Sequence, residues 1–381
     1  MARHGASKFN PRSAVPSLPP PLLYTDTHAS ADMLYFGGVE VHDPFVAFGA
    51  RGRKYTVQGA LEFGRVKKTS TFDVVLSRED WLDAAKKKYG AKAGVPEMIL
   101  CLARHFGQRA FRVADDFPAA LYVKLTRAGL RLQFADGLLF PEREIKSARE
   151  AAAIREGNRL SAVGFNTAEK VLRAARIRGR NLIHQGRPLT SERLRFLIDV
   201  AIKEAGGEAR DTIVAGGDQA CDPHELIILD IFPRHVASGY YGDMTRTYLK
   251  GRPRETQRRM VATVYDAMRG AIRRIRAGVD GRDVHQGVVD HFIAEGYETK
   301  RGADGATGFF HGTGHGLGLA VHDPGCRLGA VSSILKAGAV VTVEPGLYYP
   351  GLGGCRWEDV VQVTATGAKM LSHHPYDWEI R

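Results

Sequence analysis

Residues 311–318 read HGTGHGLG, and the four glycines of this segment constrain its backbone strongly. Each glycine disfavours a helix interior by about 1 kcal/mol relative to alanine, so a helix is not expected here. Two histidines four residues apart would suit a helical zinc site, but that motif needs a glutamate where this chain has Gly312. The overlapping GxGxxG pattern lacks the strand-to-helix context of a dinucleotide site. His311 and His315 are therefore expected to act from strand or loop backbone.

The chain as a whole is expected to form two globular domains. Its 381 residues are 44% hydrophobic, which is enough to bury a large core. Residues 22–140 alternate short apolar runs with helical stretches such as REDWLDAAKKKYG, which predicts a small α/β domain. A long helix is expected to begin at Pro141, with Ile145 facing the core. We place the domain boundary between residues 1–140 and 141–381.

Charge and cysteine content argue against several classes of protein. The N-terminal segment has five prolines and no continuous apolar stretch, so neither a signal peptide nor a membrane anchor is expected, and a cytoplasmic location is predicted. The four cysteines are scattered without a CxxC pair, which argues against a disulfide framework and a cysteine-rich zinc site. The formal net charge is +12, but the basic residues lack interleaved aromatics, which favours a solvated surface over nucleic-acid binding.

Acidic residues stand at the ends of the clearest predicted strands. Asp230 ends the apolar run LIILD, where an ionised carboxylate must be paired or bind a cation. Asp243 follows SGYYG, whose glycines allow an antiparallel hairpin in which the two aspartates face each other. Glu344 ends VVTVE before a Pro-Gly turn, and Glu358 begins EDVVQVT. With His315 these carboxylates form an oxygen-rich set that suits Mn²⁺, Fe²⁺, Co²⁺ or Zn²⁺ and exceeds the needs of one catalytic ion.

Each of these residues also has an ordinary structural interpretation. A strand-end aspartate is commonly a turn former or a helix cap, and a histidine is commonly a hydrogen-bonded polar residue. Glu358 could pair with Arg356, and Glu344 could cap a turn. No single residue identifies a metal site, so the prediction rests on the pattern that they form together.

Four segments resemble the pita-bread metallopeptidase family M24, which includes methionine aminopeptidase, aminopeptidase P and prolidase. They are LDIFPRHVASGYYGDMTRT, FHGTGHGLGLAVHDP, VVTVEPGLYYPG and GCRWEDVVQVT, in the order of the family and within residues 226–364. Residues 22–140, with SADMLYFGG, resemble the N-terminal domain of the prolidase, aminopeptidase P and creatinase branch, which methionine aminopeptidases lack. The resemblance implies an α/β (α+β) chain whose small N-terminal domain precedes a pita-bread catalytic domain with a curved antiparallel sheet.

The same resemblance implies two divalent metal ions, which are Mn, Co, Zn or Fe, and assigns their ligands. Asp243 and Glu358 match the residues that bridge the two ions in the family. Asp230 matches a ligand of one ion, whereas His315 and Glu344 match ligands of the other. All five family ligands are present in this chain.

The resemblance further implies hydrolysis of an Xaa-Pro bond in a dipeptide or short peptide by a hydroxide that bridges the metals. Glu344 would accept a proton and pass it to the leaving amine, while His311 and His322 would orient the carbonyl and stabilise the oxyanion. The glycines around them would let the backbone pass close to metals and substrate. His224 is expected to bind substrate, although only five residues separate it from Asp230. A homodimer is also expected.

Two arginines bear on the length of the substrate. A prolidase must bind the free carboxylate of a terminal proline, and a guanidinium offers paired donors to two oxygens. Arg356 would share the face of Glu358 in a strand, and Arg327 lies near the position of the prolidase arginine, so both are expected to bind substrate. Dipeptidase activity is preferred, with aminopeptidase P activity as the close alternative. A creatinase-like amidinohydrolase and a non-catalytic peptide-binding module are the other hypotheses, and both predict lost ligands.

Overall fold

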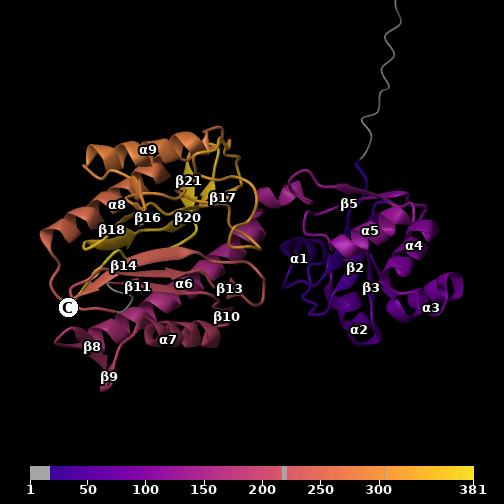
Figure 1. The fold of residues 1–381 in the computed structure, drawn as a ribbon, viewed down its shortest axis with the longest axis horizontal. Helices are drawn as coiled ribbons and strands as arrows, with labels where there is room; N and C mark the ends of the chain where they lie inside the picture. Colours follow the sequence, from indigo (N-terminus) through magenta and orange to yellow (C-terminus); the bar gives the residue numbers. More distant parts are fainter. Residues whose placement is uncertain (1–17, 217–220, 304) are drawn as a thin grey trace, which may run out of the picture. The chain divides into compact units, whose positions relative to one another are not determined.

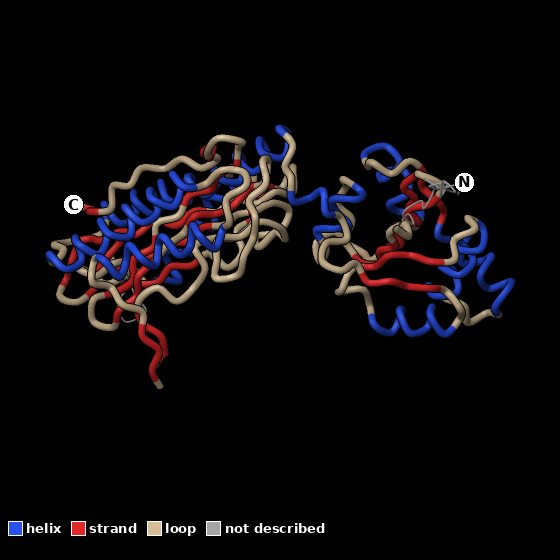
Figure 2. Tube along the Cα trace, turned by 90° about the horizontal axis from the view of Figure 1, so that it is seen from above, coloured by secondary structure: helices blue, strands red, loops and turns tan. Residues whose placement is uncertain are grey.

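The structure is a computed structural model that describes residues 18–216, 221–303 and 305–381. The chain divides into two compact units, of which the first ends at Phe140 and the second is Pro141–Arg381. Both units combine helices with strands (Figures 1 and 2). The predicted α/β fold class is therefore confirmed.

The first unit is built around a mixed sheet. Its elements in chain order are β1 (Leu22–Thr25), α1 (Ala31–Gly37), β2 (Phe45–Ala50), β3 (Arg53–Gln58), α2 (Ala60–Thr69), β4 (Val74–Ser77), α3 (Arg78–Tyr89), α4 (Val95–His105), β5 (Ala110–Val113), α5 (Ala119–Arg127) and β6 (Arg131–Phe134). The sheet has the order β1-β2-β3-β4, in which β3 and β4 are parallel and the other pairs are antiparallel. Strand β2 is apolar and buried along its whole length, as expected of a strand covered on both faces.

The second unit supplies every candidate ligand. Its helical elements are the 3-10 turn Pro141–Glu144, α6 (Ala148–Ala174), α7 (Ser191–Glu204), α8 (Glu255–Arg274) and α9 (Gly281–Ala294), and its strands are β7 (Arg176–Arg178), β8 (Asn181–His184), β9 (Arg187–Pro188), β10 (Gly207–Glu208), β11 (Ile213–Gly216), β12 (Ile227–Ile231), β13 (Arg234–His235), β14 (Met244–Lys250), β15 (Lys300–Gly302), β16 (Gly305–Thr307), β17 (Val340–Val343), β18 (Gly346–Tyr349), β19 (Gly353–Arg356), β20 (Asp359–Val363), β21 (Ala368–Met370) and β22 (Glu379–Ile380).

The strands that carry the site lie between two pairs of helices, α6 with α7 and α8 with α9 (Figure 1). They form sheets in the orders β11-β12-β14-β22, β17-β20-β21 and β18-β19. Strand β19 lies next to β12 and β14, so residues from separate sheets meet in the middle of this layer. One apolar core lies against α8 and α9 and includes Trp357, and another lies against α6 and α7 and includes Phe165.

The long helix begins later than the sequence predicts. Pro141–Glu144 form a 3-10 turn, and α6 begins at Ala148. The hydroxyl of Ser147 accepts a hydrogen bond from the backbone N–H of Glu150, whose carboxylate accepts one from the N–H of Ser147. This capping box fixes the first turn of the helix. Ile145 precedes it and is 41% exposed, so the prediction that it faces the core is wrong.

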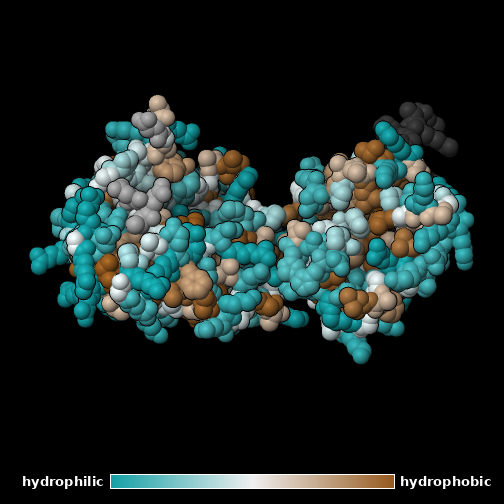
Figure 3. All heavy atoms as spheres, turned by 60° about the horizontal axis from the view of Figure 1, so that its bottom comes forward, coloured by the Kyte–Doolittle hydropathy of each residue, from teal (hydrophilic) through white to brown (hydrophobic). Residues whose placement is uncertain are grey.

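The surface of the described residues is mostly polar. Figure 3 shows largely hydrophilic residues with scattered apolar ones on the face that it displays. No helix within the described ranges has the length and apolar content to cross a membrane.

Candidate metal centre

Strands β12 and β14 carry the first two predicted ligands as antiparallel neighbours. Asp230 lies opposite Thr245 in their register, and Asp243 directly precedes β14. Side chains two residues apart in a strand share a face, so Asp243 lies diagonally across from Asp230. The predicted antiparallel pairing is present, with the two carboxylates diagonal to each other instead of directly opposite.

Helix α6 holds the backbone at Asp243. The side-chain Oδ1 of Asn158 accepts a hydrogen bond of 2.9 Å from the backbone N–H of Asp243. Gly157 precedes Asn158, and Gly242 precedes Asp243. A Cβ on Gly157 would lie 2.2 Å from the backbone N of Gly242. Any larger residue at Gly157 would therefore push the helix away. Sequence reasoning missed Asn158 because it lies 85 residues before its partner.

Strands β17 and β20 bring the two glutamates together. Their antiparallel register, carried one pair beyond the strand ends, places Glu344 opposite Glu358. Each carboxylate accepts a hydrogen bond from a threonine hydroxyl. Thr342 donates to Oε1 of Glu344 at 3.2 Å, and Thr245 donates to Oε2 of Glu358 at 2.7 Å.

His315 points its Nε2 at these carboxylates. This atom lies 3.2 Å from Oε1 of Glu344 and 3.6 Å from Oδ2 of Asp243. The Nδ1 lies 3.0 Å from the carbonyl oxygen of Gly316, which can only accept, so Nδ1 carries the proton and Nε2 is left to bind a cation. Ligand atoms of Asp243, His315 and Glu358 all lie within 4.8 Å of one another.

Residues 311–318 contain no helix and join their neighbours through single bridges, which confirms the prediction of strand or loop backbone. Close contacts explain the glycines. A Cβ on Gly314 would lie 1.9 Å from the carbonyl oxygen of Thr342, and one on Gly316 would lie 2.3 Å from the carbonyl oxygen of Asp323. Their nearest neighbours are thus other parts of the backbone, whereas the sequence suggested an approach to metals and substrate.

The carboxylates carry more negative charge than the surrounding protein compensates. Burial raises the pKa of Asp243 and Glu358 well above the usual range, and the neighbouring carboxylates raise both further. Burial also raises the pKa of Glu344 to about 7. The guanidinium of Arg356 contacts Oδ2 of Asp230, but Oδ1 of Asp230 is buried and has no hydrogen-bond partner among the described residues. Divalent cations would supply the missing positive charge, so this donor set fits metal.

Tyr348 connects a predicted histidine to a predicted arginine. Its hydroxyl oxygen lies 3.0 Å from Nε2 of His311 and 3.1 Å from Nη1 of Arg356. An arginine only donates, so the tyrosine oxygen accepts from Arg356 and its proton is directed to His311. Burial lowers the pKa of His311 to about 4, which agrees with a neutral, accepting imidazole. Tyr348 was not predicted, although it follows Glu344 by only four residues.

A cavity of about 540 Å³ opens onto the cluster. The ring of His322 lies edge-on to that of His315, with centroids 4.2 Å apart and planes at 84°. The structure thus brings both additional histidines to the cluster. The side chains that line the cavity are Phe310, His311, His315, His322, Glu344, Tyr348 and Arg356.

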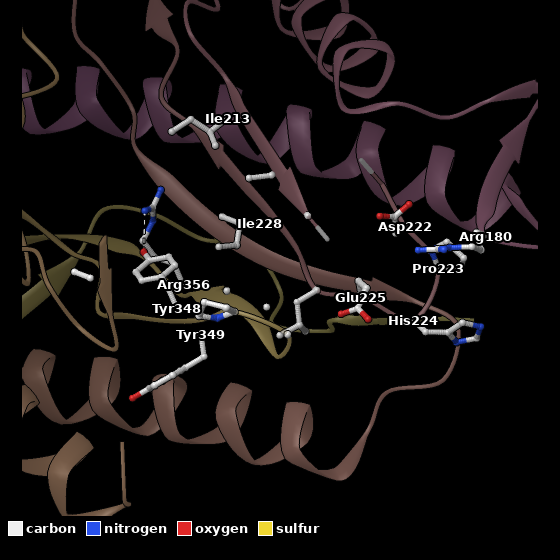
Figure 4. A pocket seen from close by; sticks show the side chains of 18 of the residues that line it. Arg180, Ile213, Asp222, Pro223, His224, Glu225, Ile228, Tyr348, Tyr349 and Arg356 are labelled. Atoms are coloured by element: carbon white, nitrogen blue, oxygen red, sulfur yellow. Dashed lines mark hydrogen bonds between the residues drawn. The ribbon is translucent and has the colours of Figure 1, made fainter. Parts of the chain in front are cut away.

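Two predicted substrate residues lie elsewhere. His224 is exposed, and its Nδ1 accepts a hydrogen bond from the N–H of Arg252 at 2.8 Å. It lines a second cavity, of about 790 Å³, at the end away from Arg356 (Figure 4). Because β12 starts three residues after His224, the short connection cannot carry this histidine to the ligands. Arg327 is exposed in a loop, lines neither cavity, and donates its backbone N–H to Ser333.

A fully buried arginine supports the ligands from behind. The Nη1 of Arg246 donates to the carbonyl oxygens of Thr245 and Glu358 at 2.9 and 2.7 Å. The Nη2 donates to Oδ1 of Asp359 at 3.1 Å and to the carbonyl oxygen of His374 at 3.0 Å. Arg246 therefore ties β14 to β20 at the residues next to the cluster. Sequence reasoning missed this role, since the partners lie more than a hundred residues along the chain.

Known proteins match this chain over the same region. A model of metallopeptidase family M24 matches residues 152–365. Uncharacterized peptidase YqhT of Bacillus subtilis is 35% identical over 183 residues, which are 45% of this chain and 49% of that protein. Xaa-Pro dipeptidase of Pyrococcus furiosus is 32% identical over 189 residues, 46% of this chain and 51% of that protein. These two matches span about half the length of the relatives.

Other matches extend over both units. Probable dipeptidase PepE of Mycobacterium tuberculosis is 26% identical over 340 residues, 86% of this chain and 83% of that protein. The solved structure of an Xaa-Pro dipeptidase from Bacillus anthracis has a TM-score of 0.79 at 21% identity, covering 96% of this chain and 95% of that chain. Aminopeptidase P from E. coli has a TM-score of 0.69 at 20% identity, and the match covers 94% of this chain and 92% of that chain. At these identities the solved structures show the fold alone.

Proposed function

Because this chain belongs to metallopeptidase family M24, we propose that it is a metal-dependent peptidase that cleaves the bond before proline in short peptides. The observation that carries the proposal is the largely buried group of four carboxylates and one imidazole, in which Arg356 is the one arginine among the described residues that contacts a carboxylate. Relatives named Xaa-Pro dipeptidase and aminopeptidase P support the choice of substrate. The amidinohydrolase and the non-catalytic module are less favoured, because all five donors are retained.

The donors would hold two divalent cations, which we propose to be Mn²⁺, Co²⁺, Zn²⁺ or Fe²⁺. Carboxylate-rich sites with one imidazole suit these ions. When bound, the ions would acidify water and polarise the scissile carbonyl. The residues proposed as ligands are Asp230, Asp243, His315, Glu344 and Glu358.

The remaining chemistry would fall to side chains that line the smaller cavity. Glu344 would accept a proton on its carboxylate and return it to the leaving amine nitrogen, as its place on the cavity beside the cluster permits. His322 and His311 would orient the substrate carbonyl and stabilise negative charge on its oxygen. Tyr348 would keep the imidazole of His311 in one orientation through its hydrogen bond.

The length of the substrate depends on which arginine binds its carboxylate. Arg356 lines both cavities and remains a candidate for binding the substrate carboxylate, although its Nη2 already contacts Asp230. Arg327 as a carboxylate clamp stays a prediction, and its exposed position gives it little support. Under that prediction, Arg327→Ala raises KM for Xaa-Pro dipeptides more than for Xaa-Pro-Yaa tripeptides. The homodimer and the cytoplasmic location also stay predictions.

Metal dependence is the direct test of the proposed function. Exhaustive chelation of the purified protein should reduce hydrolysis of Gly-Pro, Ala-Pro and Ala-Pro-Ala by at least about a thousandfold, and Mn²⁺ or Co²⁺ should restore it. Elemental analysis of the same samples gives the metal content. Undiminished turnover in protein shown to be free of metal would refute the proposal.

Two variants separate the proposed ligands from the proposed substrate-orienting histidines. Glu344→Gln should lose nearly all turnover together with metal, because it removes a charged donor. His322→Ala should keep its metal and slow turnover by about a hundredfold, as expected for a group that assists proton or charge transfer. If His322→Ala emptied the site and Glu344→Gln did not, the two assignments would be reversed.

A further inference from the structure

The cavity at the cluster adjoins a larger one. Tyr348 and Arg356 line both cavities, and their hydrogen-bonded side chains stand between the two spaces. The larger cavity, of about 790 Å³, extends from Arg356 past Ile228 to Arg180 (Figure 4). Pockets that hold drug-sized molecules measure about 300 to 1,000 Å³, so this space exceeds what the end of a dipeptide requires. Space for a longer chain therefore lies next to the site.

The outer end of the larger cavity offers an available guanidinium. Arg180 is exposed directly after Gly179, whose φ of 59° forms the tight turn between β7 and β8. Within the described ranges, no hydrogen bond or ion pair engages the side chain of Arg180. The acidic neighbour Glu225 is already bound by Arg254 at 3.1 Å. Asp222 also lines this end, but it makes no ion pair with Arg180 within 4 Å.

The sequence around Arg180 adds to the positive potential. Residues 170–191 contain six lysines and arginines and no aspartate or glutamate. Asp222 and Glu225 also line the cavity, so the excess of positive charge is confined to the β7–β8 turn, where it attracts oppositely charged ligands. A peptide carboxylate that reaches this turn is therefore favoured there.

We propose that Arg180 determines specificity by binding a carboxylate of Xaa-Pro peptides of three or more residues, an inference that rests on the proposed function. With the scissile bond at the ligand cluster, the chain beyond proline runs through the larger cavity to the β7–β8 turn. The carboxylate is either the C-terminus of the peptide or an acidic side chain. The guanidinium suits both, since it donates to two oxygens at once.

The test compares Arg180→Gln with the matched control Arg178→Gln. Arg178 is exposed on the same hairpin and lines neither cavity, so its loss changes the charge without changing the cavity. The substrates are Ala-Pro, Ala-Pro-Ala-Ala as free acid and as amide, and the amide of Ala-Pro-Ala-Glu. Arg180→Gln should raise KM about two- to fivefold for the two longer peptides that carry a carboxylate, the effect of an exposed ion pair. The neutral amide and Ala-Pro should be unaffected.

The pattern of effects identifies the carboxylate and tests the inference. An effect confined to the free acid assigns the C-terminus, and one confined to the glutamate peptide assigns the side chain. Equal effects of Arg178→Gln and Arg180→Gln, or no effect of either, would overturn the inference. Isothermal titration of the same peptides provides a readout without hydrolysis. If the wild-type protein cleaves none of them but binds them through Arg180, the proposed function fails and the role of Arg180 stands.

Discussion

The ligand cluster and the region directly behind it both bury carboxylates, but they differ in how fully the protein compensates the negative charge. Asp359 accepts hydrogen bonds from Arg246 at 3.1 Å, from Ser372 at 2.7 Å and from the hydroxyl of Tyr376. Its neighbour Glu358 accepts one from a threonine, and the nearby carboxylates of Glu344 and Asp230 raise its pKa by more than Arg356 lowers it. Successive residues of a strand point to opposite faces, so one peptide bond separates a compensated charge from an uncompensated one.

This difference separates acids that stabilise the fold from acids that require an external cation. Asp323 is a further example of the first kind, because the buried side chains of Arg143 and Lys146 both donate to it. A buried charge without a partner costs several kcal/mol, so a folded protein either keeps such a group neutral through a raised pKa or holds it where something else binds it. Burial of a carboxylate alone therefore does not identify a metal ligand, whereas burial without enough positive charge nearby does.

The largest effect is expected from removing a compensated acid. Asp359→Asn would leave the buried guanidinium of Arg246 without its counter-charge, and breaking such a pair costs about 3 to 5 kcal/mol of unfolding free energy. Urea denaturation of the metal-free variant and wild type measures the loss. A loss below about 1 kcal/mol would mean that the carbonyl acceptors of Arg246 suffice without the carboxylate.

The adjacent substitution Glu358→Gln is expected to behave in the opposite way. Without metal it relieves repulsion among the carboxylates, so the unfolding free energy should stay the same or rise. Affinity for Mn²⁺, measured by isothermal titration, should fall by at least about 100-fold, the upper range for losing a group that only supports a ligand. If metal-free Glu358→Gln were as unstable as Asp359→Asn, the two regions would not differ in how their carboxylates affect stability.

A substitution that adds no charge tests whether packing matters apart from electrostatics. Gly314→Ala would place a methyl group against the carbonyl oxygen of Thr342, and overpacking of this kind costs about 1 to 3 kcal/mol. Gly329→Ala is the control, because nothing lies within 4 Å of a Cβ there. Thermal denaturation compares the two variants. Equal melting temperatures would show that residues 311–318 shift at no cost.

The smallest effect is expected at an acid that is well supplied with donors. Asp280 accepts hydrogen bonds from the hydroxyl of Ser332 at 2.6 Å and from backbone N–H groups of Ser333 and Arg282, which lower its pKa from 3.8 to about 2. A depressed pKa stabilises the fold above pH 4, and this contribution disappears as pH falls toward 2. The difference in melting temperature between wild type and Asp280→Asn should therefore narrow from pH 4 downward. A difference that persists unchanged at pH 2.5 would contradict this assignment.

The sequence predicted the residues that donate to metal but not the residues that hold them in position. The five predicted ligands could be recognised because the short segments around them together resemble the family pattern, and the structure places these residues close to one another. Asn158 and Arg246 act through contacts that span 85 and 112 residues, and no local pattern marks them. His224 lies away from the cluster because its position depends on the path of a connecting loop, and its role in binding substrate stays a prediction.

The same reasoning explains the mixed success with the fold. Alternating apolar and polar residues reveal strands and helices, so the α/β class was predictable. The start of α6 depends on one capping box. The helix-like spacing of apolar residues extends back to Pro141, so the sequence pattern does not show where the helix begins. Element boundaries therefore depend on single hydrogen bonds that hydrophobic periodicity does not report.

Arg246 has a consequence for the order of events during protein synthesis. Two of its hydrogen bonds end on the carbonyl oxygens of His374 and Pro375. Strand β22, which follows these residues in the sequence, pairs with β14. These residues leave the ribosome after all five candidate ligands. A nascent chain that already exposes every donor still lacks the segment that completes the hydrogen bonding of Arg246 behind Glu358. The cluster should therefore gain its final geometry, and its full affinity for metal, only after residues 374 and 375 have been synthesised.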